Sequence, residues 1–224
     1  MSLVRADAIS IPLRDESVDL VVTSPPYFSL RSYTDHGEHY DGQIGSEPTP
    51  QDFLEALWAV TRECRRVLKP SGSMWVNLGD KYASGGRTTY DADDKNGGRG
   101  GARARDGFAP KTLLGLPWRY AIGCIDNLDL ILRAEVIWSK PNGLPESVTD
   151  RVRRSHEQWF HFTKEPRYFA AVDEVREPQS SLGRPQGRPN GKDHRVEDST
   201  GSSRLGHLDE LHLNPLGKLP GSVW

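Results

Sequence analysis

The chain has 224 residues, and its 29 basic and 31 acidic side chains leave a formal net charge of −2. This length is enough for one substantial α/β domain with its own core, and the charge excludes a uniformly basic nucleic-acid binder while leaving room for a local basic face. No apolar run approaches the roughly 20 residues of a membrane span, and the two cysteines do not form a ligand-type pair. We therefore expect a soluble, cytoplasmic protein without a metal site, with buried thiols at Cys64 and Cys124.

The first predicted element is a short strand rich in β-branched residues over Val18–Val22. Ser24-Pro25-Pro26 ends it abruptly, as expected of a central parallel strand that delivers a loop at its carboxyl end. Ligand sites in open α/β sheets lie at such strand ends. The loop after this strand is therefore the first candidate site.

The second predicted element is an amphipathic helix that begins after Thr49. Thr49 can cap it, Pro50 suits its first turn, and Asp52 completes a box-like cap. Apolar residues then recur at helical spacing, at Phe53, Leu54, Leu57, Val60, Cys64, Val67 and Leu68. Lys69–Gly72 is predicted to end the helix as a turn, and Ser73–Leu78 to form the second strand of a parallel β-α-β unit.

A Gly/Arg-rich insertion follows over residues 81–110, where apolar residues nearly vanish and the composition indicates a mobile basic loop. A helix over Leu113–Leu128 and a strand over Leu130–Trp138 come next, and Gln158–Thr163 is predicted to be the antiparallel neighbour of that strand. Beyond about Pro178 the chain is rich in Gly, Ser, Pro and Arg. We therefore divide the chain into a folded domain over residues 1–178 and a poorly structured or specificity-linked tail over residues 179–224.

The segment Ser24-Pro25-Pro26-Tyr27 carries the groups needed to grip an exocyclic amino group. The lone pair of an aromatic amine is delocalised into the ring, so a catalyst must draw the nitrogen toward tetrahedral geometry with acceptors aimed at its hydrogens. The prolines fix the backbone and leave the Pro25 carbonyl free to accept, while the Ser24 hydroxyl is a second acceptor. Tyr27 offers a ring face on which an extruded base can stack. In isolation the tetrapeptide also suits a rigid turn or a proline-rich ligand motif, but its place after a buried-type strand favours a catalytic loop.

The segment Asp19–Tyr27 resembles the catalytic motif of the DNA cytosine-N4 and adenine-N6 methyltransferases. Val67–Ser73 resembles the helix-to-strand turn of this family, and Ile137–Asn142 resembles its later W-x-K-P-N segment. His156-Glu157 and the aromatic residues that follow over 160–169 also fit the family pattern. These segments cover most of residues 1–170, in the order of the permuted arrangement in which the catalytic part precedes the cofactor part.

The resemblance implies a Rossmann-like α/β fold of the S-adenosylmethionine-dependent methyltransferases, incomplete at its C-terminal side. It also implies S-adenosylmethionine as methyl donor, DNA as partner, flipping of the target base, and a part in DNA methylation within restriction–modification. Ser24, Pro25, Pro26 and Tyr27 are then the catalytic residues of a catalytic domain over residues 1–178. The motif with serine first is similar to that of many cytosine-modifying members, but adenine-modifying members also carry it, so both bases stay open.

One family feature is missing from this sequence. The glycine-rich cofactor loop, of the type D-P-F-x-G-x-G-T-T, is expected near the carboxyl end, yet residues 217–224 resemble the segment just upstream of it. Gly97–Gly101 has glycines but no preceding apolar strand, so it is no substitute. We therefore expect the catalytic-loop portion of a methyltransferase, either truncated or completed by a second chain that supplies the loop.

Four residues are further candidates for the base pocket. Asn77 and Asp80 follow the second strand at the edge where the catalytic loop should emerge, although a simple strand-ending turn is an alternative. Trp138 and Lys140 are candidates for contacts with the flipped base or the backbone, the alternative being a core tryptophan beside a surface lysine. His156 and Glu157 are not expected to be catalytic, because methyl transfer from a sulfonium needs no strong general base once the amine is oriented.

Other residues are candidates for contacts with the cofactor and with DNA. Asp7 resembles the acid beside the cofactor adenine in family members, and a solvated turn aspartate is an equal alternative. Arginines can neutralise DNA phosphates, or can form only a solvated charged face beside the acidic residues of the insertion. These arginines are Arg87, Arg99, Arg103, Arg105, Arg151, Arg153 and Arg154.

Two rival functions stay compatible with the sequence. One is a non-catalytic DNA-binding remnant that keeps the base pocket and the basic loop without a donor site. The other is methylation of a glutamine side-chain amide in a protein, because related Pro-Pro-Tyr loops serve that chemistry. The recognition sequence cannot be read from one chain, because the specificity segments of this family diverge freely.

Overall fold

The computed structural model describes residues 3–30, 34–35, 38–39, 42–83, 107–143, 147–178 and 215–224. It divides into one unit of residues 1–169 with 222–224 and a second unit of residues 170–221. The second unit contains a short 3-10 helix, η1 (Val172–Val175), and a bridge between Glu177 and Lys218. The predicted domain boundary at residue 178 stays a prediction.

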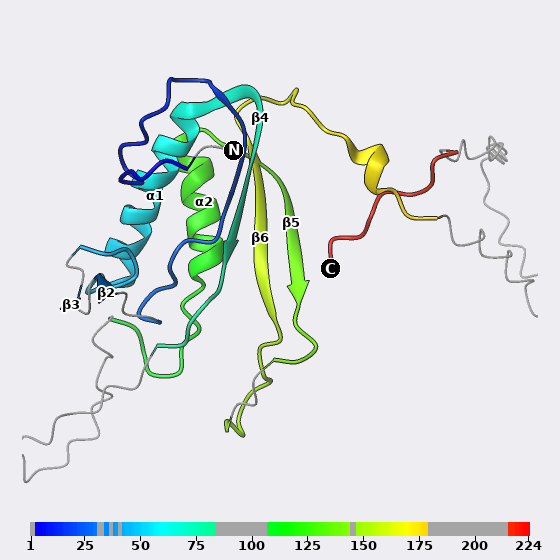
Figure 1. The fold of residues 1–224 in the computed structure, drawn as a ribbon. Coiled ribbons are helices and arrows are strands. Elements are labelled where there is room, and N and C mark those ends of the chain that lie inside the picture. The colour runs from blue at the N-terminus through cyan, green and yellow to red at the C-terminus, as the bar shows by residue number, and fades with distance from the viewer. Residues whose placement is uncertain are drawn as a thin grey trace, which may run out of the picture. The chain divides into compact units, whose positions relative to one another are not determined.

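The first unit is built on a four-stranded sheet with the strand order β1-β4-β6-β5 (Figure 1). The strands are β1 (Val18–Thr23), β4 (Leu68–Leu78), β5 (Ile131–Ser139) and β6 (His156–Thr163). Two helices, α1 (Pro50–Val67) and α2 (Leu116–Leu128), pack on one face of this sheet, and a two-stranded hairpin joins β2 (Thr34–Asp35) to β3 (Glu38–His39). The mixed α/β architecture agrees with the predicted fold class.

Helix α1 begins as predicted. The Thr49 hydroxyl accepts a hydrogen bond from the Asp52 backbone N–H at 3.1 Å, and Pro50 occupies the first turn, where its missing N–H costs nothing. The buried positions of the helix follow helical spacing, so one face packs on the sheet.

The predicted turn over Lys69–Gly72 is wrong, because the chain passes from α1 directly into the eleven-residue strand β4. Val18 pairs with Leu68 and Leu20 with Ser73, so an irregularity in the parallel register absorbs the intervening residues. Gly72 permits this close pairing, since a Cβ atom there would lie 2.8 Å from the Asp19 carbonyl oxygen. Pairs with β1 lie on both sides of Lys69–Gly72, at Leu68 and at Ser73, and these four residues form the irregular part of the strand.

Helix α2 begins at Leu116, three residues after the predicted start, and Pro117 lies in its first turn rather than its interior. Strand β5 matches the predicted span within one residue at each end, and β6 is its antiparallel partner as predicted. Strand β6 also pairs antiparallel with β4, with Asn77 opposite Trp159 and Leu78 opposite Gln158. The sequence did not predict this second pairing.

The strand directions bring four chain segments to one edge of the sheet. Because β1 and β4 are parallel while β6 is antiparallel to both β4 and β5, the carboxyl ends of β1, β4 and β5 lie at the same edge as the amino end of β6. The Ser24–Tyr27 loop, Gly79-Asp80, Lys140 and His156-Glu157 therefore all emerge there.

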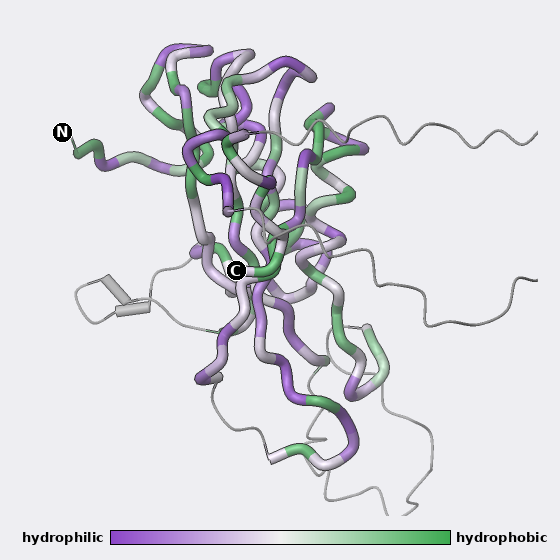
Figure 2. The backbone as a smooth tube through the Cα atoms, turned by 90° about the vertical axis from the view of Figure 1, so that its right-hand side faces the viewer, coloured by the Kyte–Doolittle hydropathy of each residue, from purple (hydrophilic) through white to green (hydrophobic). Residues whose placement is uncertain are grey.

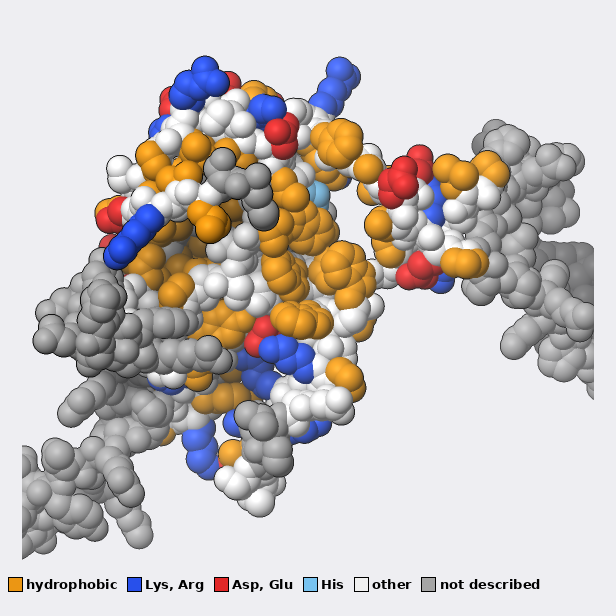
Figure 3. All heavy atoms as spheres, in the orientation of Figure 1, with side chains coloured by type: hydrophobic (Ala, Val, Ile, Leu, Met, Phe, Trp, Pro, Cys, Tyr) orange, Lys and Arg blue, Asp and Glu red, His pale blue; other side chains and the backbone are white. Residues whose placement is uncertain are grey.

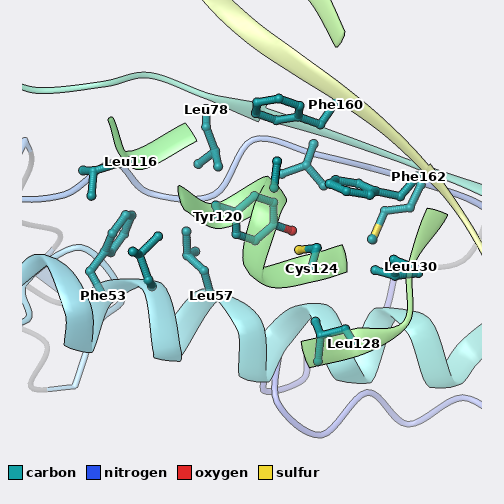
Figure 4. Close-up of a cluster of buried hydrophobic side chains, with 14 of the residues drawn as sticks. Phe53, Leu57, Leu78, Leu116, Tyr120, Cys124, Leu128, Leu130, Phe160 and Phe162 are labelled. Carbon is teal, nitrogen blue, oxygen red and sulfur yellow. The ribbon is translucent and has the colours of Figure 1, made fainter. Parts of the chain in front are cut away.

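The hydrophobic core lies between the helices and the sheet (Figure 4). Phe53 and Leu57 of α1 and Tyr120 of α2 meet Phe160 and Phe162 of β6, which are fully buried. Hydrophobic residues recur along the helices and strands in Figure 2, as this arrangement requires. Cys64 and Cys124 are free buried thiols, which confirms the prediction for both.

The opposite face of the sheet keeps exposed apolar side chains. Leu20 and Val22 of β1 are 54% and 60% exposed, and hydrophobic side chains gather over the strands on the face shown in Figure 3. Trp75 of β4 stacks on His161 of β6 at 4.4 Å between ring centroids, and the chain end runs beside β5, where Val223 pairs with Ile137.

Two predicted segments fall largely outside the described residues. Of the insertion, only its ends are described: the Ala83 N–H donates to the Thr112 carbonyl at 2.7 Å and the Leu114 N–H donates to the Lys81 carbonyl at 2.9 Å. Residues 84–106, and residues 179–214 of the predicted tail, lie outside. Across the described ranges, no helix is long and apolar enough to span a membrane.

The contact between α1 and α2 depends on Gly123. A Cβ atom at this position would lie 2.0 Å from the Trp58 ring, whose indole N–H donates to the Tyr120 carbonyl at 3.1 Å. Although alanine is the better helix former, we expect Gly123→Ala to lower the free energy of unfolding by about 1–2 kcal/mol in urea titrations, because the ring must move. At Gly221, where a Cβ atom would meet nothing within 4 Å, alanine should change it by less than about 0.5 kcal/mol. Equal effects of the two variants would contradict the packing role of Gly123.

Candidate active site

The Ser24–Tyr27 loop follows β1 without an intervening turn and is anchored at its far end. Phe28 is buried against Phe53 with ring centroids 5.4 Å apart, and the Ser29 N–H donates to the Gly45 carbonyl at 2.7 Å. Gly45 has a positive φ of 100°, and a Cβ atom there would lie 3.0 Å from the Tyr27 carbonyl oxygen. The loop therefore packs on a glycine that no other residue can replace without backbone strain.

Asn77 of β4 connects this loop to the sheet. Its side chain is 2% exposed, and its amide Nδ2 donates to the Gln158 carbonyl on β6 at 3.2 Å. The amide oxygen Oδ1 therefore faces the loop, where it accepts from the Ser24 hydroxyl at 3.1 Å and from the Tyr27 hydroxyl at 2.7 Å. Because the Ser24 proton is directed at Asn77, the lone pairs of Ser24 Oγ are left to accept from another donor.

The Tyr27 hydroxyl has a second acceptor on β6. It lies 3.0 Å from Glu157 Oε2, and the other carboxylate oxygen of Glu157 forms an ion pair with Lys140 Nζ. Burial, with a further contribution from the Glu157 carboxylate against an opposing one from Ser24, raises the pKa of Tyr27 to about 12. The phenol therefore stays protonated over the whole physiological pH range.

Gly79 leaves room for the Tyr27 ring to pack against the backbone. A Cβ atom at Gly79 would lie 2.6 Å from the Cε2 atom of that ring, so the ring packs against glycine backbone immediately after β4. A larger residue there would displace the ring. Glycine is thus used for close approach, although its sequence context suggests only a strand end.

Two adjoining cavities open around these residues. One of about 340 Å³ is lined by Ser24, Pro25, Pro26, Tyr27, Leu30, Asn77, Trp138, Lys140 and Glu157. A larger one of about 830 Å³ shares Tyr27, Leu30, Trp138, Lys140 and Glu157, and extends along Gly79–Tyr82 and residues 139–143 and 154–156. Ser24 and Pro25, whose hydroxyl and carbonyl oxygens can accept hydrogen bonds, thus line the smaller cavity together with apolar side chains.

Asp80 lines the larger cavity but has a structural task. Its side chain is 4% exposed, and its carboxylate accepts from the N–H groups of Gly115 and Leu116 at 3.0 Å each, and from Lys81 at 2.9 Å. It thereby caps α2, since Gly115 itself provides no side-chain cap. A direct contact of Asp80 with a base stays a prediction.

Trp138 and Lys140 line both cavities. The alternative of a core tryptophan does not hold, because Trp138 is 43% exposed, with the Lys140 ammonium 4.9 Å from the centroid of one of its rings. Asp7 lies elsewhere: it is exposed, and its carboxylate accepts from the Ile9 N–H at 3.1 Å in a local turn. This geometry matches the turn aspartate that the sequence left as an alternative.

The predicted arginines are only partly described. Arg154 lies 3.9 Å from Asp80 and lines the larger cavity, and Arg151 lies 3.7 Å from the centroid of the Tyr82 ring. Arg153 is exposed and donates to the Gly143 carbonyl at 2.6 Å. Arg87, Arg99, Arg103 and Arg105 lie outside the described residues. Among the described residues, no group of three or more His, Cys, Asp or Glu side chains could hold a metal ion.

Sequence reasoning missed Glu157 and Gly79. Glu157 was set aside as a proton acceptor, but β6 pairs with β5 so that Glu157 lies opposite Trp138 and beside Lys140. The signal that could have found it is the pairing of β5 with β6, which places the end of one strand beside the start of the other. Gly79 carries no such signal, because the need for glycine comes from a ring that lies 52 positions away in the chain.

Comparison with known proteins gives one family and several relatives. The family described as DNA methylase matches residues 18–224. The Type II methyltransferase M.SmaI of Serratia marcescens is 44% identical over 171 residues, which are 75% of this chain and 56% of the relative. The Type II methyltransferase M.XycI of Xanthomonas campestris pv. cyanopsidis is 42% identical over 191 residues, which are 81% of this chain and 60% of the relative. The chain thus spans little more than half the length of these curated relatives.

A solved structure shares the fold. The chain described as PvuII DNA methyltransferase (cytosine-N4-specific) superimposes with a TM-score of 0.54 at 18% identity, over 76% of this chain and 51% of that one. At this identity the likeness concerns the fold. It agrees with the predicted Rossmann-like methyltransferase architecture, of which the chain covers part.

The cap formed by Asp80 can be tested by its removal. Asp80→Ala leaves three backbone N–H groups without their acceptor, so we expect the free energy of unfolding in urea to fall by about 1–2 kcal/mol. Asp126→Ala, at an exposed position of the same helix, should change it by less than about 0.5 kcal/mol. An Asp80 variant as stable as the Asp126 variant would show that the cap contributes nothing.

Proposed function

Because this chain belongs to the DNA methylase family that matches its residues 18–224, we propose that it carries the catalytic loop of a DNA methyltransferase acting on an exocyclic amino group, cytosine N4 or adenine N6. The observation that carries this proposal is the hydrogen bond from the Ser24 hydroxyl to Asn77 Oδ1 at 3.1 Å. It fixes the direction of the serine proton and leaves the lone pairs of Ser24 Oγ free to accept, in a cavity that Pro25 also lines. Two acceptors close together suit an amino group with two hydrogens.

The residues prepare the amine for attack in two ways. Ser24 Oγ and the Pro25 carbonyl accept its two hydrogens, which draws the nitrogen out of conjugation with the ring and gives it a usable lone pair. Because the prolines and Asn77 hold both acceptors before the substrate arrives, little reorganisation is needed. A bound methyl donor would supply its methyl group to this lone pair, and the hydrogen that the amine loses would leave as a proton to solvent.

DNA is the proposed substrate, and its target base is flipped into the cavities. Tyr27 lines both cavities and supports stacking of an extruded base, while Trp138 gives a further apolar wall. Lys81 and Arg154 border the larger cavity and can meet the phosphates on either side of the flipped nucleotide. The glutamine amide of a protein, which needs no such basic border, is less well supported.

S-adenosylmethionine is the proposed methyl donor, and when bound it supplies the methyl group as a sulfonium. The described residues do not by themselves fit it: Asp7 caps a local turn, and no described strand runs through a glycine-rich turn directly into a helix. The donor site is therefore proposed to need protein beyond these residues, from the same polypeptide or from a second chain.

The decisive test is chemical. Incubation of the 224-residue chain with S-adenosylmethionine and unmethylated genomic DNA, followed by mass spectrometry of the digested nucleosides, should give N4-methylcytosine or N6-methyladenine above background and would identify the base. In a parallel assay on protein, methylation of a glutamine side chain without DNA methylation would replace the proposed substrate.

The loop variants connect the geometry to the rate. Ser24→Ala removes one acceptor and Tyr27→Ala the stacking ring, and each should lower the rate of DNA methylation by roughly 100-fold or more. Ser17→Ala and Tyr168→Ala, which alter a serine and a tyrosine outside both cavities, should stay within about twofold of the unsubstituted chain. Unchanged turnover in either loop variant would remove the assigned role of that residue.

A second candidate is a DNA-binding fragment or remnant without its own donor site. The observation that favours it is the lack of a donor-binding turn among the described residues, noted above. It predicts salt-dependent DNA binding in fluorescence anisotropy together with no saturable S-adenosylmethionine binding in calorimetry. Donor binding with a 1:1 stoichiometry by this chain alone would rule this candidate out.

A further inference from the structure

We propose that Glu157, held by Lys140, is a positioning residue that fixes the phenol of Tyr27 and so sets the plane of the ring on which the target base stacks. The proposal deepens the proposed function and rests on it, because it gives Glu157 a role toward the same substrate. It starts from the geometry of three side chains: Tyr27 on the loop, Glu157 at the start of β6 and Lys140 just after β5.

The ring of Tyr27 is held at two places. At one edge it packs on Gly79, where a Cβ atom would come within 2.6 Å of Cε2. At its tip the hydroxyl lies 2.7 Å from Asn77 Oδ1 and 3.0 Å from Glu157 Oε2. Because the hydroxyl is hydrogen-bonded to residues of both β4 and β6, it cannot rotate toward either cavity, and the ring keeps one orientation.

The number of hydrogens available around the Tyr27 hydroxyl shows that Glu157 acts on Tyr27 through its negative charge. Asn77 presents only its oxygen to Tyr27, because its Nδ2 donates to the Gln158 carbonyl. Glu157 brings no hydrogen either, because its carboxylate is paired with the Lys140 ammonium. The single hydroxyl hydrogen of Tyr27 therefore serves two acceptors, and loss of that hydrogen would place a phenolate beside the Glu157 carboxylate. Burial and the charge of Glu157 together favour the neutral, hydrogen-donating form of Tyr27.

Burial protects this arrangement. The Glu157 side chain is 17% exposed and that of Lys140 is 38% exposed, so the carboxylate is the shielded member of the pair and the ammonium reaches the cavity. The Lys140 ammonium also lies over Trp138, on the wall shared by both cavities. The Lys140 ammonium therefore holds the Glu157 carboxylate through an ion pair on its solvent side, and this carboxylate holds the Tyr27 hydroxyl through a hydrogen bond.

The first test reads Tyr27 itself and needs no methyl transfer. With tyrosine labelled at Cζ with carbon-13, the Tyr27 signal is assigned by its loss in Tyr27→Phe, and its ionisation is followed by NMR to pH 11. With a pKa of about 12, roughly a tenth of Tyr27 is ionised at pH 11. Glu157→Gln keeps the shape but removes the charge and adds a donor, so the pKa should fall by about one unit and roughly half of Tyr27 should be ionised at that pH.

Glu165→Gln is the matched control. Glu165 is an exposed glutamate just beyond the other end of β6, and its replacement should leave the Tyr27 titration unchanged. Circular dichroism at pH 11 checks that each variant is folded. An unchanged Tyr27 titration in a folded Glu157→Gln variant would overturn the proposal.

The second test asks whether Glu157 acts through Tyr27 or touches the substrate. Glu157→Gln and Tyr27→Phe should each lower the single-turnover rate of DNA methylation by about 10- to 100-fold, because each releases the ring. The double variant should be no slower than the slower single variant, since both changes remove the same constraint. If the two rate losses multiply in the double variant, Glu157 contacts the substrate directly and the positioning role is overturned. A blank in all nucleoside digests would count against the proposed function, while the NMR titration would still decide the role of Glu157.

Discussion

The candidate site depends on one buried amide. Asn77 of β4 donates to a carbonyl on β6 and accepts from two hydroxyls of the loop after β1, so one 2% exposed side chain joins three segments of the sheet edge. Because its donor side is used by the neighbouring strand, its oxygen can only face the loop. This choice fixes the direction of the Ser24 proton and places the Tyr27 hydroxyl, and both candidate substrate contacts follow from it.

The sheet makes this junction possible through its mixed strand directions. A parallel pair, β1 and β4, brings the loop and Asn77 to one edge, and the antiparallel β6 brings its amino end to that edge from the opposite direction. The helices occupy the other side of the sheet from Asn77 and Glu157, where Phe160 and Phe162 alternate with the outward residues of β6. The core therefore supports the site without entering it, and Asp80 connects the two by capping α2.

The Ser24–Tyr27 loop is fully formed in a chain that spans only part of its relatives' length. The chain spans 56% of the M.SmaI relative and 60% of the M.XycI relative, yet the loop, its two glycine supports and the Asn77 junction all come from within residues 24–157. None of these contacts needs a donor-binding segment. In the proposed function, orientation of the amine is therefore a separate task from binding of the donor.

The sequence by itself determined the elements that local chemistry controls: the β-branched strand that ends before Ser24, the capped helix after Thr49, the buried thiols and the family motif in the loop. Only the tertiary structure decided what depends on pairing between distant segments. The composition of Lys69–Gly72 suggested a turn, but these residues form an irregular part of β4 between two pairs with β1. Glu157 had no distinctive sequence signal, but the pairings of β6 place it beside Tyr27 and Lys140. Helix and strand propensity depends on neighbouring residues. Strand register, and the close approach of one segment to another, depend instead on residues far away in the chain.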